Sequence, residues 1–166
     1  MATALITGAS AGLGLEFAWQ LATARHDVVL VARDTDRLER LAGQLRAAAG
    51  VRAEVISADL SDRAQVERVA DRLRQTERPV GLLVNNAGFG MGASFVDGDL
   101  AEHERGLDVM VRAVMVLTHA AVGPMVGRGR GAVLNVSSIA ALSAFGTYSA
   151  AKAWVRVFTE GPAVEP

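Results

Sequence analysis

Three closely spaced glycines near the amino terminus constrain this sequence more than any other feature. Gly8, Gly12 and Gly14 follow a short apolar run and open a segment with helical periodicity. In such a turn the first glycine permits a tight bend, the second lets backbone approach a pyrophosphate, and the third lets helix and strand pack closely. The N–H groups that begin the helix then face the phosphates. This order predicts a dinucleotide-binding α/β fold, with a purely structural glycine turn as the alternative.

Short apolar runs alternate with helical patterns along the rest of the chain. Strands are expected at 4–7, 28–31, 53–57, 82–84 and 132–136. Repeated strand–helix alternation predicts a doubly wound parallel sheet of the Rossmann-like type, with about five strands in the order 3-2-1-4-5 and helices on both faces. No repeat, linker or low-complexity tract divides the chain, so we expect a single dinucleotide-binding domain over 1–166.

Helix faces and ends are also suggested by the pattern. Leu13, Phe17 and Leu21 recur every four residues and predict the apolar face of the first helix. Arginines on the polar face of the second helix are expected to be solvated: Arg37, Arg40 and Arg46. Residues expected to cap helix ends are Gly50, Ser61 and the pair Asp99 and Glu102, the last two as a capping box.

Composition narrows the class of protein. The 17 basic and 18 acidic residues give a net charge of −1, without the basic excess of a nucleic-acid binder. There is no cysteine for disulfides or thiolate metal sites, and His26, His103 and His119 lack metal-ligand spacing. No uninterrupted apolar run approaches the roughly 18 residues of a membrane span, and no basic region precedes the first strand. We therefore expect a cytoplasmic protein without nucleic-acid, membrane or metal partners.

The end of the second predicted strand bears on the choice of cofactor. An acidic residue there would bind the adenosine ribose and favour NAD(H), whereas this strand ends in Ala32 and Arg33. The arginine offers charge for a 2′-phosphate, so NADP(H) is favoured. Asp34 follows immediately and keeps NAD(H) open, and a merely solvated Arg33 is the bland alternative.

Four motifs in order resemble the short-chain dehydrogenase/reductase family. They are the turn from Thr7 to Gly14, the pair Asp59-Leu60, the segment Asn85-Asn86-Ala87-Gly88, and Ser138 followed by Tyr148-x-x-x-Lys152. The resemblance implies cofactor contacts from Gly8, Ser10, Ala11, Gly12, Leu13, Gly14, Arg33, Asp59, Leu60, Asn86, Ala87, Gly88, Tyr148 and Lys152.

The same resemblance implies an oxidoreductase that moves hydride between NADP(H) and a carbonyl or secondary alcohol. Tyr148 and Lys152 are four residues apart and share one helix face. An ammonium group near a phenol favours the phenolate, which suits proton transfer to or from the substrate oxygen. Ser138 is expected to hydrogen-bond that oxygen, whereas Ser137 is expected to be structural. Lys152 would also hold the nicotinamide ribose, as the resemblance implies.

The sequence departs from the family pattern in several places. Met110 stands where relatives usually have an asparagine that organises a proton path, and the loop 140–147 is shorter than usual. Pro162 and Pro166 interrupt the last predicted helix, and the C-terminal substrate-lid part of the family is absent from the 166 residues. These departures keep a non-catalytic dinucleotide-binding or partner protein open as the alternative function. An epimerase or dehydratase is a third possibility, although these usually space the N-terminal glycines differently.

The segment from Leu107 to Val122 is apolar nearly all round. Such a helix must be covered on both sides, since large apolar patches are rarely left in water. We therefore expect a homodimer or homotetramer formed through the Leu107–Val122 and Tyr148–Phe158 helices.

Overall fold

Five short apolar segments form one parallel sheet in the computed structural model, which describes residues 2–92 and 95–161. The strands lie in the order β3-β2-β1-β4-β5, as predicted. Their bounds are β1 Thr3–Thr7, β2 Asp27–Ala32, β3 Ala53–Ser57, β4 Val80–Asn85 and β5 Ala132–Asn135.

The central strands are buried on both faces, which explains their uninterrupted apolar sequences. Successive side chains of a strand point to opposite faces. Ile6 of β1 belongs to one core cluster, whereas its neighbour Leu5 belongs to the other. Ile6 is in register with Leu30 of β2 and Val84 of β4, and all three side chains are fully buried.

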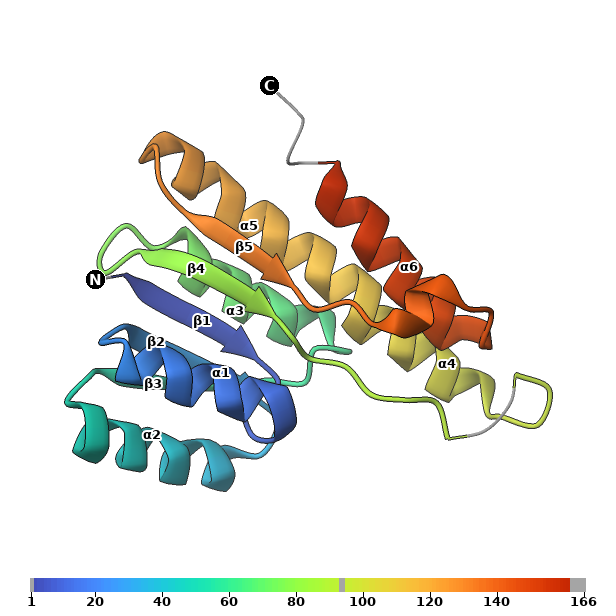
Figure 1. The fold of residues 1–166 in the computed structure, drawn as a ribbon, viewed down its shortest axis with the longest axis horizontal. Helices are drawn as coiled ribbons and strands as arrows, with labels where there is room; N and C mark the ends of the chain where they lie inside the picture. The colour runs from blue at the N-terminus through green and yellow to red at the C-terminus, as the bar shows by residue number, and fades with distance from the viewer. Residues whose placement is uncertain (1, 93–94, 162–166) are drawn as a thin grey trace.

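Helices cover both faces of the sheet (Figure 1). One face is covered by α1 (Gly12–Thr23) and α2 (Thr35–Ala49). The opposite core includes residues of α3 (Arg63–Arg74), η1 (Asp108–Arg112), α5 (Ala113–Gly127) and α6 (Gly146–Glu160). The remaining elements are α4 (Leu100–Leu107) and the short 3₁₀ helix η2 (Ile139–Leu142). Pro162 and Pro166 lie outside the described residues.

The prediction for the apolar face of α1 is confirmed only in part, since Phe17 and Leu21 pack partly buried against the core but Leu13 does not. Leu13 is 63% exposed, and the buried residues are Gly14, Ala18 and Ala22. Phe17 and other large side chains of the helix are only partly buried against the core. Small residues let the helix approach the sheet closely, so size rather than hydrophobicity determines which face turns inward.

The ends of α2 and α3 test the expected caps. Gly50 ends α2 in the left-handed conformation, with φ +66°, as predicted. The cap of α3 is Asp62 rather than Ser61, because the Asp62 carboxylate accepts a hydrogen bond from the Gln65 N–H. The N–H and hydroxyl of Ser61 instead bind the carboxylate of Asp59, at 2.9 and 2.7 Å.

The start of α4 is capped on one side only. Asp99 accepts a hydrogen bond from the Ala101 N–H, as an N-cap should. Glu102 does not complete the predicted capping box, because its carboxylate accepts from the Gly92 N–H instead. The acidic pair therefore ties the preceding loop to the helix.

A continuous helix runs from Leu100 to Gly127 and contains a π-helical turn at Asp108–Arg112. By length and composition alone it could span a membrane, but half of its most apolar window is buried inside the fold. The core helix of a soluble protein meets the same criteria. Its exposed side includes Met115 and Val126, at 45% and 73% exposure.

Gly14 provides a test of the close packing between α1 and the sheet. A Cβ there would lie 2.1 Å from the Gly8 carbonyl oxygen, whereas a Cβ at Gly43, inside α2, meets nothing within 4 Å. We expect Gly14→Ala to lower the free energy of unfolding by about 3 kcal/mol or more, because backbone must move. Gly43→Ala should raise it by up to about 1 kcal/mol. Urea denaturation measures both, and equal effects would contradict the packing argument.

Candidate active site

A group of hydrogen bonds joins the carboxyl ends of β1 and β4, where the strand order reverses. The Thr7 hydroxyl oxygen accepts from the N–H groups of Asn86 and Ala87, each at 3.0 Å, and donates to the Val84 carbonyl at 3.4 Å. The Asn86 side-chain amide donates to the Thr7 carbonyl at 3.0 Å. In open α/β sheets, ligands bind at such a switch point.

The glycine turn lies directly against this group of hydrogen bonds. Gly8 has φ +69°, and a Cβ on it would lie 2.9 Å from Nδ2 of Asn86. Gly12 has φ +54° and faces open space, whereas Gly14 is confined by the Gly8 backbone. Gly8 thus permits the bend, Gly12 leaves space for a ligand to approach the backbone, and Gly14 allows close contact between the helix and the turn. These are the separate requirements on which the dinucleotide prediction was based.

A cavity of about 1080 Å³ lies at this end of the sheet. Among the predicted site residues, Gly14 does not line it because it packs behind the turn. The predicted residues that line it are Gly8, Ser10, Ala11, Gly12, Leu13, Arg33, Asp59, Leu60, Asn86, Ala87, Gly88, Ser138, Tyr148 and Lys152.

Tyr148 and Lys152 reach the cavity from one face of α6. The Lys152 ammonium lies 5.9 Å from the centroid of the Tyr148 ring and donates a hydrogen bond to the Val136 carbonyl at 2.9 Å. The Ser137 hydroxyl donates to the Lys152 carbonyl at 2.8 Å, which ties α6 to the end of β5. That bond fits the structural role expected of Ser137.

Ser138 stands where the chain leaves β5. Its hydroxyl oxygen caps η2 by accepting a hydrogen bond from the Ala140 N–H at 3.1 Å. Within the shortened 140–147 segment, the Ser143 hydroxyl donates to the Ala140 carbonyl at 2.9 Å. The short loop is therefore an ordered wall beside Ser138.

Burial sets the electrostatic character of Lys152. The residue is 5% exposed, and desolvation lowers the pKa of its ammonium below the ordinary lysine value. No ion pair is recorded for it within the described parts of the chain. A buried cation beside a phenol and a cavity is a strong candidate for a functional role.

The opposite end of the cavity is basic. Arg33 is exposed there, and Arg37 of α2 lines the same space. Asp34 caps α2 by accepting from the Arg37 N–H at 3.0 Å, and it pairs with the Arg37 guanidinium at 3.2 Å. The Asp34 carboxylate, on account of which NAD(H) was kept as an alternative cofactor, is thus already bound by Arg37. Arg37 was expected only on a solvated face, because sequence spacing does not show that the first turn of α2 borders the cavity.

Asp59 lies between the basic end and the middle of the cavity. Partial burial raises the pKa of its carboxyl, but hydrogen bonds from Ser61 and the charges of Arg105 and Arg33 outweigh burial and lower the pKa below its usual value. Arg105 lies 3.6 Å from the carboxylate and 5.8 Å from the ring centroid of Phe89. Arg105 and Phe89 also line the cavity and were not predicted from the sequence, since Phe89 lies just past the end of a motif and Arg105 lies in a helix that carries none.

Comparison with known proteins agrees with this geometry. The sequence profile described as short chain dehydrogenase matches residues 2–165. The chain belongs to the short-chain dehydrogenase family. It is 32% identical to a very-long-chain 3-oxoacyl-CoA reductase of Anas platyrhynchos and 33% identical to the ketoacyl reductase HetN of Nostoc sp.. These alignments cover 96% and 95% of this chain but 53% and 56% of those proteins, so this short-chain dehydrogenase chain spans about half their length.

Solved structures of the family superpose closely on it. A short-chain dehydrogenase from Sphingobium yanoikuyae in complex with NADPH matches with a TM-score of 0.94 at 38% identity, over 97% of this chain and 64% of that one. A bulky-bulky ketone specific alcohol dehydrogenase from Comamonas testosteroni gives 0.94 at 34% identity, over 97% and 66%. The five-stranded part of the short-chain dehydrogenase fold is therefore preserved.

Met110 of this short-chain dehydrogenase lies in the π-helical turn and is 1% exposed. A Cβ on Gly88 would lie 3.3 Å from the Met110 sulfur and 3.5 Å from the Lys152 ammonium nitrogen. The thioether therefore occupies the neighbourhood of Lys152. Sulfur is only a weak hydrogen-bond acceptor there.

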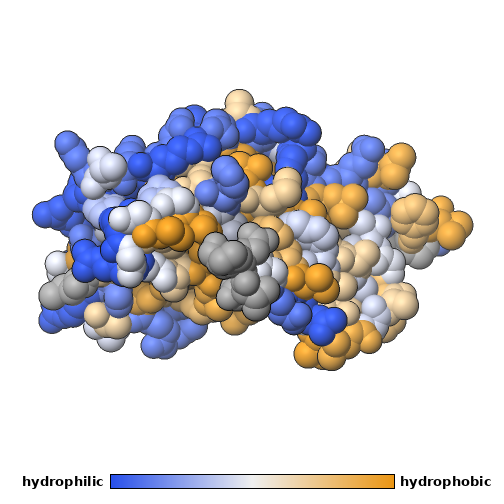
Figure 2. Space-filling view, turned by 90° about the horizontal axis from the view of Figure 1, so that it is seen from above, coloured by the Kyte–Doolittle hydropathy of each residue, from blue (hydrophilic) through white to orange (hydrophobic). Residues whose placement is uncertain are grey.

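Hydrophobic side chains are exposed beside the Ser138 end of the cavity. Ile139 and Leu142 of η2 and Phe145 at the start of α6 are 89%, 77% and 76% exposed. Figure 2 shows hydrophobic surface gathered at the end of the molecule where Figure 1 places η2 and α4. The Ser138 end of the cavity is thus bordered by apolar surface, whereas the Arg33 end is charged.

Lys152 makes the stability of the fold depend on pH in a specific direction. Because burial lowers its folded-state pKa, the folded protein is penalised while the lysine is protonated. That penalty is present below the folded pKa and is relieved as pH rises toward the unfolded value of about 10.4. Urea denaturation should show wild type gaining stability relative to Lys152→Met across this interval. A difference that is flat or falls with pH would contradict the burial argument.

Proposed function

We propose that the protein is an NADP(H)-dependent oxidoreductase that acts on a carbonyl or secondary alcohol. The observation that carries this proposal is one continuous cavity with two chemically different ends. Arg33 and Arg37 lie at one end, and Ser138, Tyr148 and Lys152 lie at the other. A molecule that spans the cavity would place an anionic group at the first end and a reacting group at the second.

The glycine turn fits the phosphates of a dinucleotide. The first residues of α1 have no side-chain cap, since the N-cap residue is Ala11. Their N–H groups and the positive end of the helix dipole are therefore free to bind anionic oxygens. Gly12 leaves space for that approach, and Arg33 with Arg37 provides guanidinium groups for a 2′-phosphate.

Three side chains supply the chemistry around the substrate oxygen. When bound, the nicotinamide cofactor supplies or accepts the hydride. Tyr148 gives or takes the alcohol proton, and the Lys152 cation favours the phenolate form. Ser138 donates a hydrogen bond to the oxygen where charge develops. Lys152 also holds the nicotinamide ribose in this proposal.

The activities for which relatives are named support the same substrate class. They include 3-oxoacyl-CoA and ketoacyl reductases and an alcohol dehydrogenase specific for bulky ketones. Two of the solved relatives were determined in complex with NADPH. The single domain over 1–166, the cytoplasmic location and the lack of nucleic-acid or membrane partners stay predictions.

Cofactor preference tests the basic end of the cavity. We expect NADPH to bind more tightly than NADH, and Arg33→Ala to weaken NADPH binding about tenfold or more, since charge-assisted hydrogen bonds would be lost. Arg37→Ala should act in the same direction. NADH affinity should change little in either variant, because NADH lacks the 2′-phosphate. Fluorescence titration gives both affinities, with exposed Arg40→Ala as the matched control. Equal losses for NADPH and NADH would remove the assignment.

Enzyme turnover tests the end of the cavity that carries Ser138, Tyr148 and Lys152. We expect Tyr148→Phe to lower NADPH oxidation at least about 100-fold while NADPH affinity stays nearly unchanged. We expect Met110→Asn to raise turnover, because an amide replaces a weak acceptor beside Lys152. The assay follows absorbance at 340 nm with a panel of ketones, aldehydes and quinones. Activity that survives Tyr148→Phe would refute the mechanism. NADPH binding with no turnover in any variant would favour the non-catalytic alternative.

A homodimer or homotetramer is also proposed, through the Leu107–Val122 and Tyr148–Phe158 helices. Exposed apolar side chains on these helices support it, among them Leu107, Met115 and Val157 at 41%, 45% and 59% exposure. Sedimentation velocity at micromolar concentration should give at least a dimer, and Met115→Glu should shift it toward monomer. A stable wild-type monomer would contradict this proposal.

A further inference from the structure

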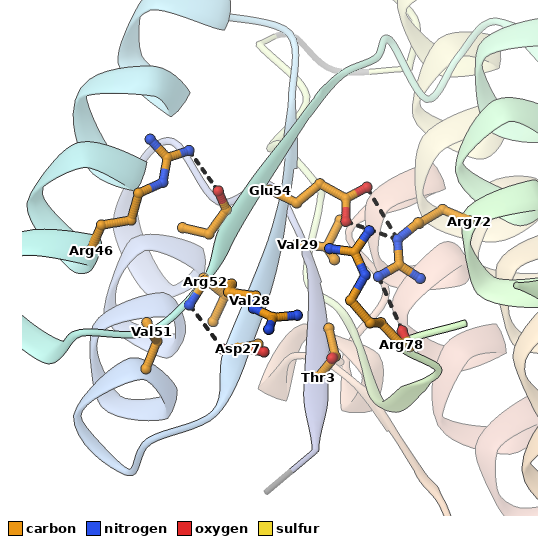
Figure 3. A pocket seen from close by; sticks show the side chains of 11 residues that line it. Thr3, Asp27, Val28, Val29, Arg46, Val51, Arg52, Glu54, Arg72 and Arg78 are labelled. Carbon is orange, nitrogen blue, oxygen red and sulfur yellow. Dashed lines mark hydrogen bonds and ion pairs between the residues drawn. The ribbon is translucent and has the colours of Figure 1, made fainter. Parts of the chain in front are cut away.

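A second concave site lies at the other end of the strands, where β1, β2 and β3 begin. It is a cavity of about 400 Å³. Figure 3 shows Arg46 of α2 on one side of it and Arg72 of α3 with Arg78 on the other. None of its lining residues lines the cavity described above.

Arg72 is the central residue of this site. It is 5% exposed, and its Nε lies 2.9 and 3.1 Å from the two carboxylate oxygens of Glu54. Its Nη2 donates to the Arg78 carbonyl at 3.2 Å. Its Nη1 is buried and has no hydrogen-bond partner among the described residues. This nitrogen has almost no exposed surface, so the positive charge of Arg72 is held within the cavity wall.

The charges around Arg72 leave a positive excess. The cavity is lined by four guanidinium groups and two carboxylates: Arg46, Arg52, Arg72, Arg78, Asp27 and Glu54. The carboxylates are already engaged, Glu54 by Arg72 and Asp27 by the Arg52 backbone N–H at 2.8 Å. Arg46 donates to the Ala53 carbonyl at 2.6 Å.

Two of the arginines remain available to a ligand. No hydrogen bond or ion pair is recorded for the side chains of Arg52 and Arg78 within the described residues, and both residues are exposed. The backbone of Arg78 also has φ +49°, which is uncommon for residues other than glycine or asparagine. This backbone directs the Arg78 carbonyl to Arg72, so the loop before β4 is held at the edge of the cavity.

We propose that this cavity binds a phosphoryl dianion, either inorganic phosphate or a phosphate monoester. A dianion would balance the excess of two positive charges among the lining residues. Guanidinium groups match phosphate oxygens with paired N–H donors, and several of them converge here. Arg78 and Arg52 are its ligands, and Arg72, held by Glu54 and the Arg78 carbonyl, adds positive charge at the cavity wall.

The experiment is a titration of the protein with inorganic phosphate and separately with glycerol 3-phosphate, at constant ionic strength. NMR reports on each site by position: the Arg72 side-chain Nε–Hε and the Glu54 amide for this cavity, and the Gly12 amide for the glycine turn. We expect saturable shifts at the first two. Arg78→Gln and Arg52→Gln should each weaken that binding about tenfold or more.

Two controls separate this site from the cofactor cavity. Arg33→Gln should leave the phosphate titration of the Arg72 resonance unchanged, and so should Arg40→Gln on the outer face of α2. Binding of either phosphoryl compound with the expected response to Arg78→Gln supports the proposal. Shifts confined to the glycine turn, shifts reproduced by chloride at the same ionic strength, or unchanged affinity in Arg78→Gln would overturn it.

Discussion

The fold and its candidate site depend on the hydrogen bonds between Thr7 and Asn86. One threonine hydroxyl serves two N–H groups and a carbonyl, and the Asn86 amide closes the arrangement. These bonds fix the carboxyl ends of β1 and β4 side by side, where the chain reverses its direction of progress across the sheet. Gly8 and Gly14 then have no room for a side chain, because the turn lies against Asn86. The start of α1 is held in place as a result, with its N–H groups free.

A second polar network fixes the next elements of the sheet in the same way. The Asn85 side chain donates to Thr118 of α5 at 3.1 Å and to Asn135 of β5 at 2.8 Å. Asn135 in turn donates to Thr159 of α6 at 3.0 Å. Satisfied polar networks of this kind, here partly buried, favour one arrangement of the elements over others. The helix that carries Tyr148 and Lys152 is thereby fixed relative to the strand that carries the glycine turn.

Much of this was predictable from sequence, for identifiable reasons. The alternation of strand and helix patterns predicted all five strands and their order, and the central strands were the clearest because they are buried on both faces and have uninterrupted apolar sequences. The site residues were predicted together because they follow strand ends, which meet at one edge of a parallel sheet. What depends on side-chain size or on distant neighbours was not predictable. The inward face of α1 is made of Gly14, Ala18 and Ala22, and Arg37 and Arg72 line cavities through the packing of α2 and α3.

The central claim is that the cavity at the β1–β4 switch point binds a nicotinamide dinucleotide with its two ends assigned. A crystal structure with NADPH tests it most directly. The account predicts the pyrophosphate at the N–H groups following Ala11, the 2′-phosphate beside Arg33 and Arg37, and the nicotinamide ring beside Tyr148 and Lys152. NADPH bound in the reverse direction, or bound elsewhere with this cavity empty, would contradict the account.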